Sequence, residues 1–115
     1  ENALEVLLNS PAYSRTMDAK GPKMVSGDFA PHGKLSQHIK DVQLMVDEAA
    51  LNGRRLPLSD VHLELLRQAE TAGYGELDNS VVIRAMDGTL PTDAGDERRS
   101  PKPAATPPKT VSKRA

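Results

Sequence analysis

The sequence contains no cysteine, and this absence excludes disulfides, thiolate metal ligands and a thiol nucleophile. No apolar run approaches the roughly 20 residues that a membrane-spanning helix needs, and no signal-peptide pattern opens the chain. Acidic and basic residues nearly balance, at 16 and 15, so the whole chain has no electrostatic attraction for nucleic acid. We therefore expect a cytoplasmic protein without a membrane or nucleic-acid partner.

Aliphatic side chains become scarce from about Gly88 onward, where Pro, Thr, Lys, Arg, Ala and Asp dominate. Such a segment cannot bury enough apolar surface to offset its ordering entropy. The sequence predicts a folded domain over residues 1–87 and a disordered, basic, Pro-rich tail over residues 88–115. A solvated tail is the favoured interpretation. The alternative is nonspecific contact with polyanions, but no aromatic residue lies among the basic ones to stack on bases.

The predicted folded part is small for independent stability, because a domain of this size buries only about 60% of its unfolded surface. The first residue is Glu1 rather than Met, and a helical pattern begins at once. We expect the chain to be a fragment of a longer protein and to bury some apolar surface against a partner.

Helical periodicity dominates residues 1–87 and predicts an all-α fold. The expected helices cover about residues 3–8, 12–20, 34–52, 58–72 and 81–86. Ser10 is expected to cap the second helix, which should stop at Gly21-Pro22, and residues 23–33 should form an irregular loop. The Val81-Val82-Ile83 run alone is compatible with a strand, but no second strand is present to pair with it.

Two of these helices have predicted apolar faces. In the longest helix the face comprises Leu35, Ile39, Val42, Val46, Ala49 and Ala50, and Gly53 follows as the C′ residue. In the next helix it comprises Leu58, Val61, Leu65, Ala69 and Ala72, with Ser59 or Asp60 as the cap and Gly73 at the end. Asp78 or Asn79 is expected to cap the last, short helix.

The common catalytic and nucleotide-binding motifs do not occur, among them Gly-x-Gly-x-x-Gly and His-Glu-x-x-His. The three histidines, His32, His38 and His62, lack metal-ligand spacing, so we predict no metal site.

A polar stripe runs along the longest helix, away from its apolar face, through Ser36, Lys40, Gln43 and Asp47. Lysine is rarely buried, which favours a solvated surface. Alternatively, the stripe borders a cleft against another domain, where the ammonium of Lys40 meets an anionic or carbonyl-bearing ligand. Periodicity alone does not choose between the two.

Five blocks in order carry a family resemblance. They are Gly21-Pro22-Lys23-Met24, Phe29-Ala30-Pro31, His38-Ile39-Lys40-Asp41, Leu56-Pro57-Leu58 and Gly73-Tyr74-Gly75-Glu76-Leu77-Asp78-Asn79-Ser80. Together they resemble the C-terminal helical domain of the β-hydroxyacid dehydrogenase family, which includes 3-hydroxyisobutyrate dehydrogenase and 2-hydroxy-3-oxopropionate reductase. The 6-phosphogluconate dehydrogenases share this fold.

The resemblance implies that Lys40 contacts the cofactor, NAD or NADP, and that Phe29 and Asp41 lie at the pocket of a small hydroxyacid or semialdehyde substrate. The family's catalytic lysine and its Rossmann domain have no counterpart in these 115 residues, so we assign no catalytic residue and expect the fragment alone to be inactive. Pro31-His32-Gly33-Lys34 also lacks the second aromatic of the family's usual Pro-Gly-Phe-Arg loop.

The alternative function is a non-catalytic helical assembly or binding module. Either function is compatible with a homo-oligomer, because the helical domains of related enzymes also form the dimer interface.

Overall fold

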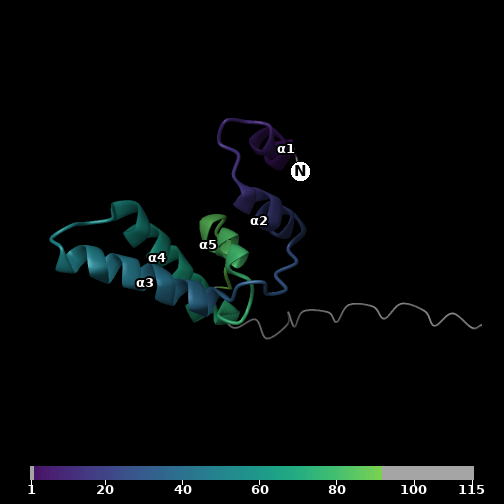
Figure 1. The fold of residues 1–115 in the computed structure, drawn as a ribbon. Coiled ribbons are helices and arrows are strands. Elements are labelled where there is room, and N and C mark those ends of the chain that lie inside the picture. Colours follow the sequence, from purple (N-terminus) through teal and green to yellow (C-terminus); the bar gives the residue numbers. More distant parts are fainter. Residues whose placement is uncertain (1, 92–115) are drawn as a thin grey trace, which may run out of the picture.

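The computed structural model describes residues 2–91, so most of the predicted tail lies outside the described residues. These residues form a helical domain (Figure 1). Its elements are α1 (Asn2–Leu8), α2 (Arg15–Ser26), α3 (Leu35–Leu51), α4 (Pro57–Ala69), a turn (Glu70–Tyr74) in which Gly73 adopts φ +92°, a 3-10 helix (Asn79–Val82) and α5 (Ile83–Met86). The all-α prediction is confirmed, and the only β pairing in the described range is an isolated bridge between Lys34 and Asp78.

Helices α3 and α4 form a hairpin that projects away from α1, α2 and α5 (Figure 1). The buried core lies at the base of this hairpin, where α3, α4 and the 3-10 helix meet. Its apolar members are Leu35, Ile39, Val42, Leu63, Leu66, Ala69, Val81 and Val82. The predicted face of α3 is therefore buried over its first half, while Val46 is only partly covered and Ala50 is exposed.

The end of α3 agrees with its prediction to within one residue. Gly53 adopts φ +66°, in the left-handed region that favours glycine. Its N–H donates to the carbonyl of Ala50, and the N–H of Arg54 donates to that of Ala49 over 2.8 Å. This is the Schellman arrangement, which satisfies carbonyls that a helix end leaves free.

Helix α2 differs from its prediction at both ends. It begins at Arg15 with Ser14 in the N-cap position, and it continues through Pro22 to Ser26 before Gly27 ends it. Pro22 removes one helical hydrogen bond, but contacts elsewhere in the fold hold the helix together. Lys20 forms an ion pair with Asp78, and Met24 packs against the core. Residues 23–26 are therefore helical rather than part of a loop.

Helix α4 buries a side that overlaps the predicted one only in part. Leu63 and Leu66 are buried in the core, whereas Leu58 is 88% exposed and Val61 58% exposed. Of the predicted stripe, Ala69 is fully buried and Leu65 is partly buried against the core. The buried side of α4 is therefore rotated from the predicted stripe towards Leu63 and Leu66.

The start of α4 also differs from its prediction. Pro57 occupies the first turn, where its missing N–H costs nothing, and neither Ser59 nor Asp60 caps the helix.

At the other end of the folded unit, Leu90 packs against the core, three residues past the predicted domain boundary.

Candidate functional site

Backbone hydrogen bonds join residues 29–35 to residues 77–79, between α2 and the base of the α3–α4 hairpin. We call these two joined segments the clamp. The loop before α3 contains Phe29, whose carbonyl accepts a hydrogen bond from the N–H of Asp78 over 2.9 Å. The N–H of Asn79 donates to the carbonyl of Gly33 over 2.9 Å, and that of Leu35 donates to the carbonyl of Leu77 over 2.8 Å. These bonds fix the loop that carries Phe29 at the start of the helix that carries Lys40.

The carboxylate of Asp78 is the centre of this clamp and is fully buried. It accepts two hydrogen bonds from the ammonium of Lys20, at 2.9 and 2.8 Å. It also accepts from the backbone N–H groups of His32 (3.0 Å) and Gly33 (3.3 Å), and from both the N–H and the hydroxyl of Ser80. The predicted N-cap role of Asp78 is confirmed by the Ser80 contact. Asp78 also joins α2 and the loop before α3 to the last two short helices.

Burial of Asp78 alone would raise the pKa of its carboxyl. The hydrogen bonds from Lys20, Ser80 and His32 outweigh that effect and hold the pKa well below its ordinary range. The carboxylate is therefore ionised, and every oxygen has a partner. A group so fully engaged suits an anchor of the fold better than a proton donor or acceptor.

Phe29 is partly buried and packs against the apolar core. The guanidinium of Arg84 lies 5.6 Å from the centre of its ring, within cation–π range. The backbone hydrogen bonds of the clamp and these two side-chain contacts together fix the position of the ring.

Lys40 and Asp41 are both exposed on α3. Among residues 2–91, no carboxylate forms an ion pair with Lys40 and no hydrogen bond joins it to Phe29 or Asp41. The structure therefore places the predicted cofactor residue on the outside of the described domain. It does not join the three predicted site residues into one polar network.

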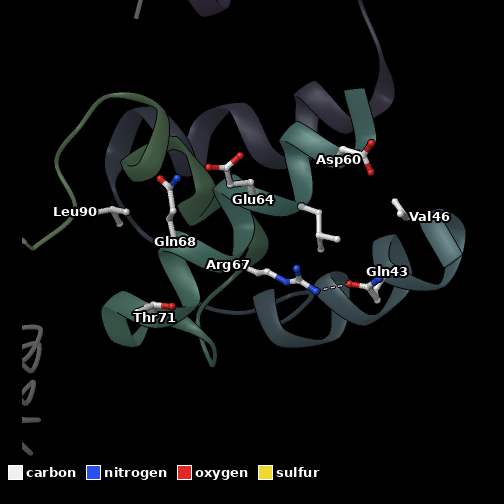
Figure 2. Close-up of a pocket in the computed structure, with 9 residues that line it drawn as sticks. Gln43, Val46, Asp60, Glu64, Arg67, Gln68, Thr71 and Leu90 are labelled. Atoms are coloured by element: carbon white, nitrogen blue, oxygen red, sulfur yellow. Dashed lines mark hydrogen bonds between the residues drawn. The ribbon is translucent and has the colours of Figure 1, made fainter. Parts of the chain in front are cut away.

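A groove of about 680 Å³ lies between α3 and α4 (Figure 2). Gln43 of the polar stripe lines it and donates to Asp47 over 2.7 Å, while Arg67 of α4 donates to the side-chain oxygen of Gln43. Asp60 and Glu64 also line the groove, so its charges are mixed. Lys40 is not among the lining residues, and the groove is therefore separate from the predicted cofactor contact.

The sequence did not predict the contact between His38 of α3 and His62 of α4, whose Nε2 atoms lie 3.1 Å apart. Burial, followed by the nearby His62, lowers the pKa of His38, against an opposing effect of Asp41. Only one of the two Nε2 atoms can donate a hydrogen bond to the other, so the other ring must accept it. The neutral form of His38, which its lowered pKa favours, is compatible with this pairing. Within residues 2–91, no group of three or more His, Cys, Asp or Glu side chains is arranged to hold a metal ion.

Comparison with known proteins defines the class to which this helical domain belongs. Residues 1–86 match the family model described as the NAD-binding domain of NADP-dependent 3-hydroxyisobutyrate dehydrogenase. A crystal structure of 3-hydroxyisobutyrate dehydrogenase from Salmonella typhimurium is similar, with a TM-score of 0.68 and 29% identity over 71% of this chain and 29% of that one. The fold is thus the C-terminal helical domain of such dehydrogenases.

Two relatives have names that agree with this class. L-threonate dehydrogenase of Escherichia coli K12 is 34% identical over 76% of this chain and 29% of its own length. 2-Hydroxy-3-oxopropionate reductase of the same strain is 28% identical over 72% of this chain and 28% of its own length. A third relative, cytokine-like nuclear factor N-PAC of Drosophila melanogaster, is 33% identical over 56% of this chain.

The chain belongs to the 3-hydroxyisobutyrate dehydrogenase family of NAD-binding domains. NAD or NADP, the cofactor class expected from the sequence, is the cofactor class of this family. The chain spans about 29% of the length of the L-threonate dehydrogenases that it matches. No helix in the described range is long and apolar enough to cross a membrane.

Proposed function

We propose that these residues form the helical domain of an NAD(P)-dependent oxidoreductase that acts on a small β-hydroxyacid or its semialdehyde, in the manner of 3-hydroxyisobutyrate dehydrogenase. The family match over residues 1–86 is the observation that carries this proposal. Relatives named as L-threonate dehydrogenase and 2-hydroxy-3-oxopropionate reductase support the substrate class. The cytoplasmic location expected from the sequence stays a prediction.

In this proposal Lys40 contacts the cofactor. Its ammonium is exposed and has no carboxylate partner within residues 2–91, so it is available to an incoming ligand. A fixed cation of this kind can hold the carbonyl or phosphate oxygens of a dinucleotide by directed charge. The bound dinucleotide would supply the hydride donor or acceptor.

Phe29 and Asp41 complete the proposed contribution of this chain. The ring of Phe29, held by the clamp and by Arg84, would shield the substrate pocket from water. Asp41 lies next to Lys40 on an exposed side of α3 and would border the same pocket. The resemblance implies that the general acid or base is a lysine outside these 115 residues.

Lys40→Ala in the full-length parent tests the assignment. Loss of the ammonium should raise the dissociation constant of the reduced cofactor and lower kcat/KM by at least about 10-fold. Cofactor fluorescence titration and steady-state kinetics measure the two effects. Gln37→Ala, an exposed change one turn earlier on α3, serves as the matched control and should leave both unchanged. Unaltered kinetics in Lys40→Ala would remove the cofactor role.

A second candidate function, a non-catalytic assembly module, is favoured by the exposed apolar residues of the domain. Val6, Leu44, Leu51 and Leu58 are all more than half exposed. Such a module would form oligomers, as helical domains of this kind are expected to do, without binding a dinucleotide. The titration above separates the two, because an assembly module binds no reduced cofactor.

A further inference from the structure

Two imidazole rings meet where α3 packs against α4. The Nε2 atoms of His38 and His62 lie 3.1 Å apart, and the rings form a T-shaped pair with their centroids 5.3 Å apart. Each ring is partly buried. Each also adjoins the core in sequence, since His38 precedes the buried Ile39 and His62 precedes the buried Leu63. The pair therefore joins the two helices at the edge of the core.

This contact has room for only one proton between the two Nε2 atoms. A neutral imidazole has one N–H donor and one acceptor nitrogen, whereas a protonated imidazole donates from both nitrogens. In the closed contact one Nε2 donates and the other accepts. If both rings were protonated, two N–H groups would face each other without an acceptor, and two like charges would share a partly buried contact. The doubly protonated pair is therefore incompatible with the packed helices.

The groups around His38 are on balance unfavourable to a second proton. Burial lowers the pKa of His38 most, followed by the nearby His62. Asp41, one turn later on α3, opposes them, and Lys20 of α2 adds to them. Within residues 2–91, neither ring of the pair forms an ion pair with a carboxylate.

The other described elements near the pair supply no carboxylate to either ring. On α2, Lys20 is bound to Asp78, whose oxygens already have partners. The 3-10 helix that packs against α3 and α4 has no charged side chain. On α4, Asp60 and Glu64 line the groove, which does not include the pair. A second proton would therefore meet no compensating negative charge apart from that of the exposed Asp41.

We propose that His38 and His62 form a proton-operated latch, which holds α3 against α4 near neutral pH and releases in mild acid. The latch does not depend on the proposed function. Lys40 and Asp41 follow His38 within one turn, so release would also free the part of α3 that carries two of the proposed site residues.

The direction of the effect follows from the number of protons that each form binds. Once the helices separate, both rings are free to take up a proton, so the open form binds more protons than the closed form and acid favours it. Release should begin as the pH falls through the ordinary histidine range, near about 6.5. This range lies above the one in which protonation of a carboxylate such as Asp78 matters, so the two effects are separable.

Hydrogen exchange in the full-length parent, followed by mass spectrometry, tests the latch. Peptides that cover α3 and α4 are compared at about pH 7.5 and about pH 5.5, with each rate corrected for intrinsic exchange at that pH to give a protection factor. The variants are His38→Gln, His62→Gln and the two together, because glutamine forms hydrogen bonds without gaining a charge. His32→Gln is the matched control, since His32 is exposed and lies outside the pair. Circular dichroism checks that each variant is helical.

We expect the protection factors of α3 and α4 to fall about 3- to 10-fold between these pH values in the unsubstituted protein and in His32→Gln. The fall should be smaller in each single variant and absent from the double variant. Equal protection at both pH values in the unsubstituted protein would overturn the proposal. A fall that persists in full in His62→Gln would assign the effect to the burial of one ring and would also overturn the latch. If the double variant is not helical, the two single variants still separate these outcomes.

Discussion

The role of Asp78 could be predicted from the sequence only in part. Its place before a short helix predicted a cap, and the structure confirms one. The sequence did not indicate the partner from α2, Lys20, because 58 residues separate the two. Ser80 completes the same network, so the last residues of the Gly73–Ser80 block serve to hold the domain together. The residues that end this family block therefore have a structural role in the described domain.

Asp78→Asn should destabilise the domain by about 3 kcal/mol, because it leaves the partly buried ammonium of Lys20 without its charged partner. Urea unfolding followed by circular dichroism measures the loss. Glu76→Gln is the control, since it breaks the exposed ion pair with Lys34 and should change stability little. A loss no greater than that of the control would show that the buried pair does not anchor α2.

The stability of the domain should fall in acid for the same reason. The pKa of Asp78 is lowered by folding, so the unfolded chain takes up a proton more readily than the native domain does. The stabilisation is complete above the ordinary carboxyl range, begins to fall below about pH 5 and is fully lost only below the lowered pKa of the native domain. In Asp78→Asn this part of the pH dependence should disappear, which unfolding curves from about pH 6 down to about pH 2 would show. An unchanged acid dependence would assign it to other carboxylates.

At the scale of the element, the sequence predicted correctly the bounds of a helix when these depend on residues nearby in the chain. The ends of α3 follow from its apolar repeat and from Gly53, so the prediction was correct to within one residue. The extent of α2 was predicted wrongly, because Lys20 and Met24 stabilise the helix through contacts distant in sequence. The buried face of α4 was predicted only in part, with Ala69 and Leu65 correct and Leu58 and Val61 exposed, since periodicity identifies apolar sides without identifying the neighbour that covers each one.

Gly53→Ala should cost about 1 kcal/mol, because φ +66° strains any residue with a Cβ. An added Cβ would meet no atom within 4 Å, so the cost is conformational and not steric. Gly33→Ala is the matched control, since Gly33 also has open space but no positive φ. Thermal unfolding of the two variants measures the difference. Equal melting temperatures would mean that the turn after α3 adjusts without strain.

At the scale of the whole molecule, five sequence blocks were enough to predict the family, and the family match over residues 1–86 confirms it. The blocks include both Lys40 and the Asp78 clamp, which the structure separates into an exposed residue and a buried network. The specific substrate could not be predicted, because the resemblance places only Phe29 and Asp41 of this chain at the substrate pocket. The role of Lys40 stays a proposal, because its exposed position on α3 also fits a solvated surface.

The isolated 115-residue chain should self-associate and should show no dehydrogenase activity. Large apolar side chains such as Val6, Leu51 and Leu58 are exposed on the described domain, and their burial between copies would stabilise it. Sedimentation velocity at several concentrations tests the first expectation, and reduction of NAD or NADP with L-threonate or 3-hydroxyisobutyrate tests the second. A stable monomer at all concentrations would contradict the association.

The 58-residue separation between Lys20 and Asp78 also affects how the domain is made. A ribosome adds residues at about 5 to 20 per second, so α2 waits roughly 3 to 12 seconds for the aspartate that anchors it. During that interval the nascent helix has neither its ion pair nor a finished core, and it is open to chaperones and proteases. Translation speed over this stretch of the message would therefore influence how much of the newly made protein survives to fold.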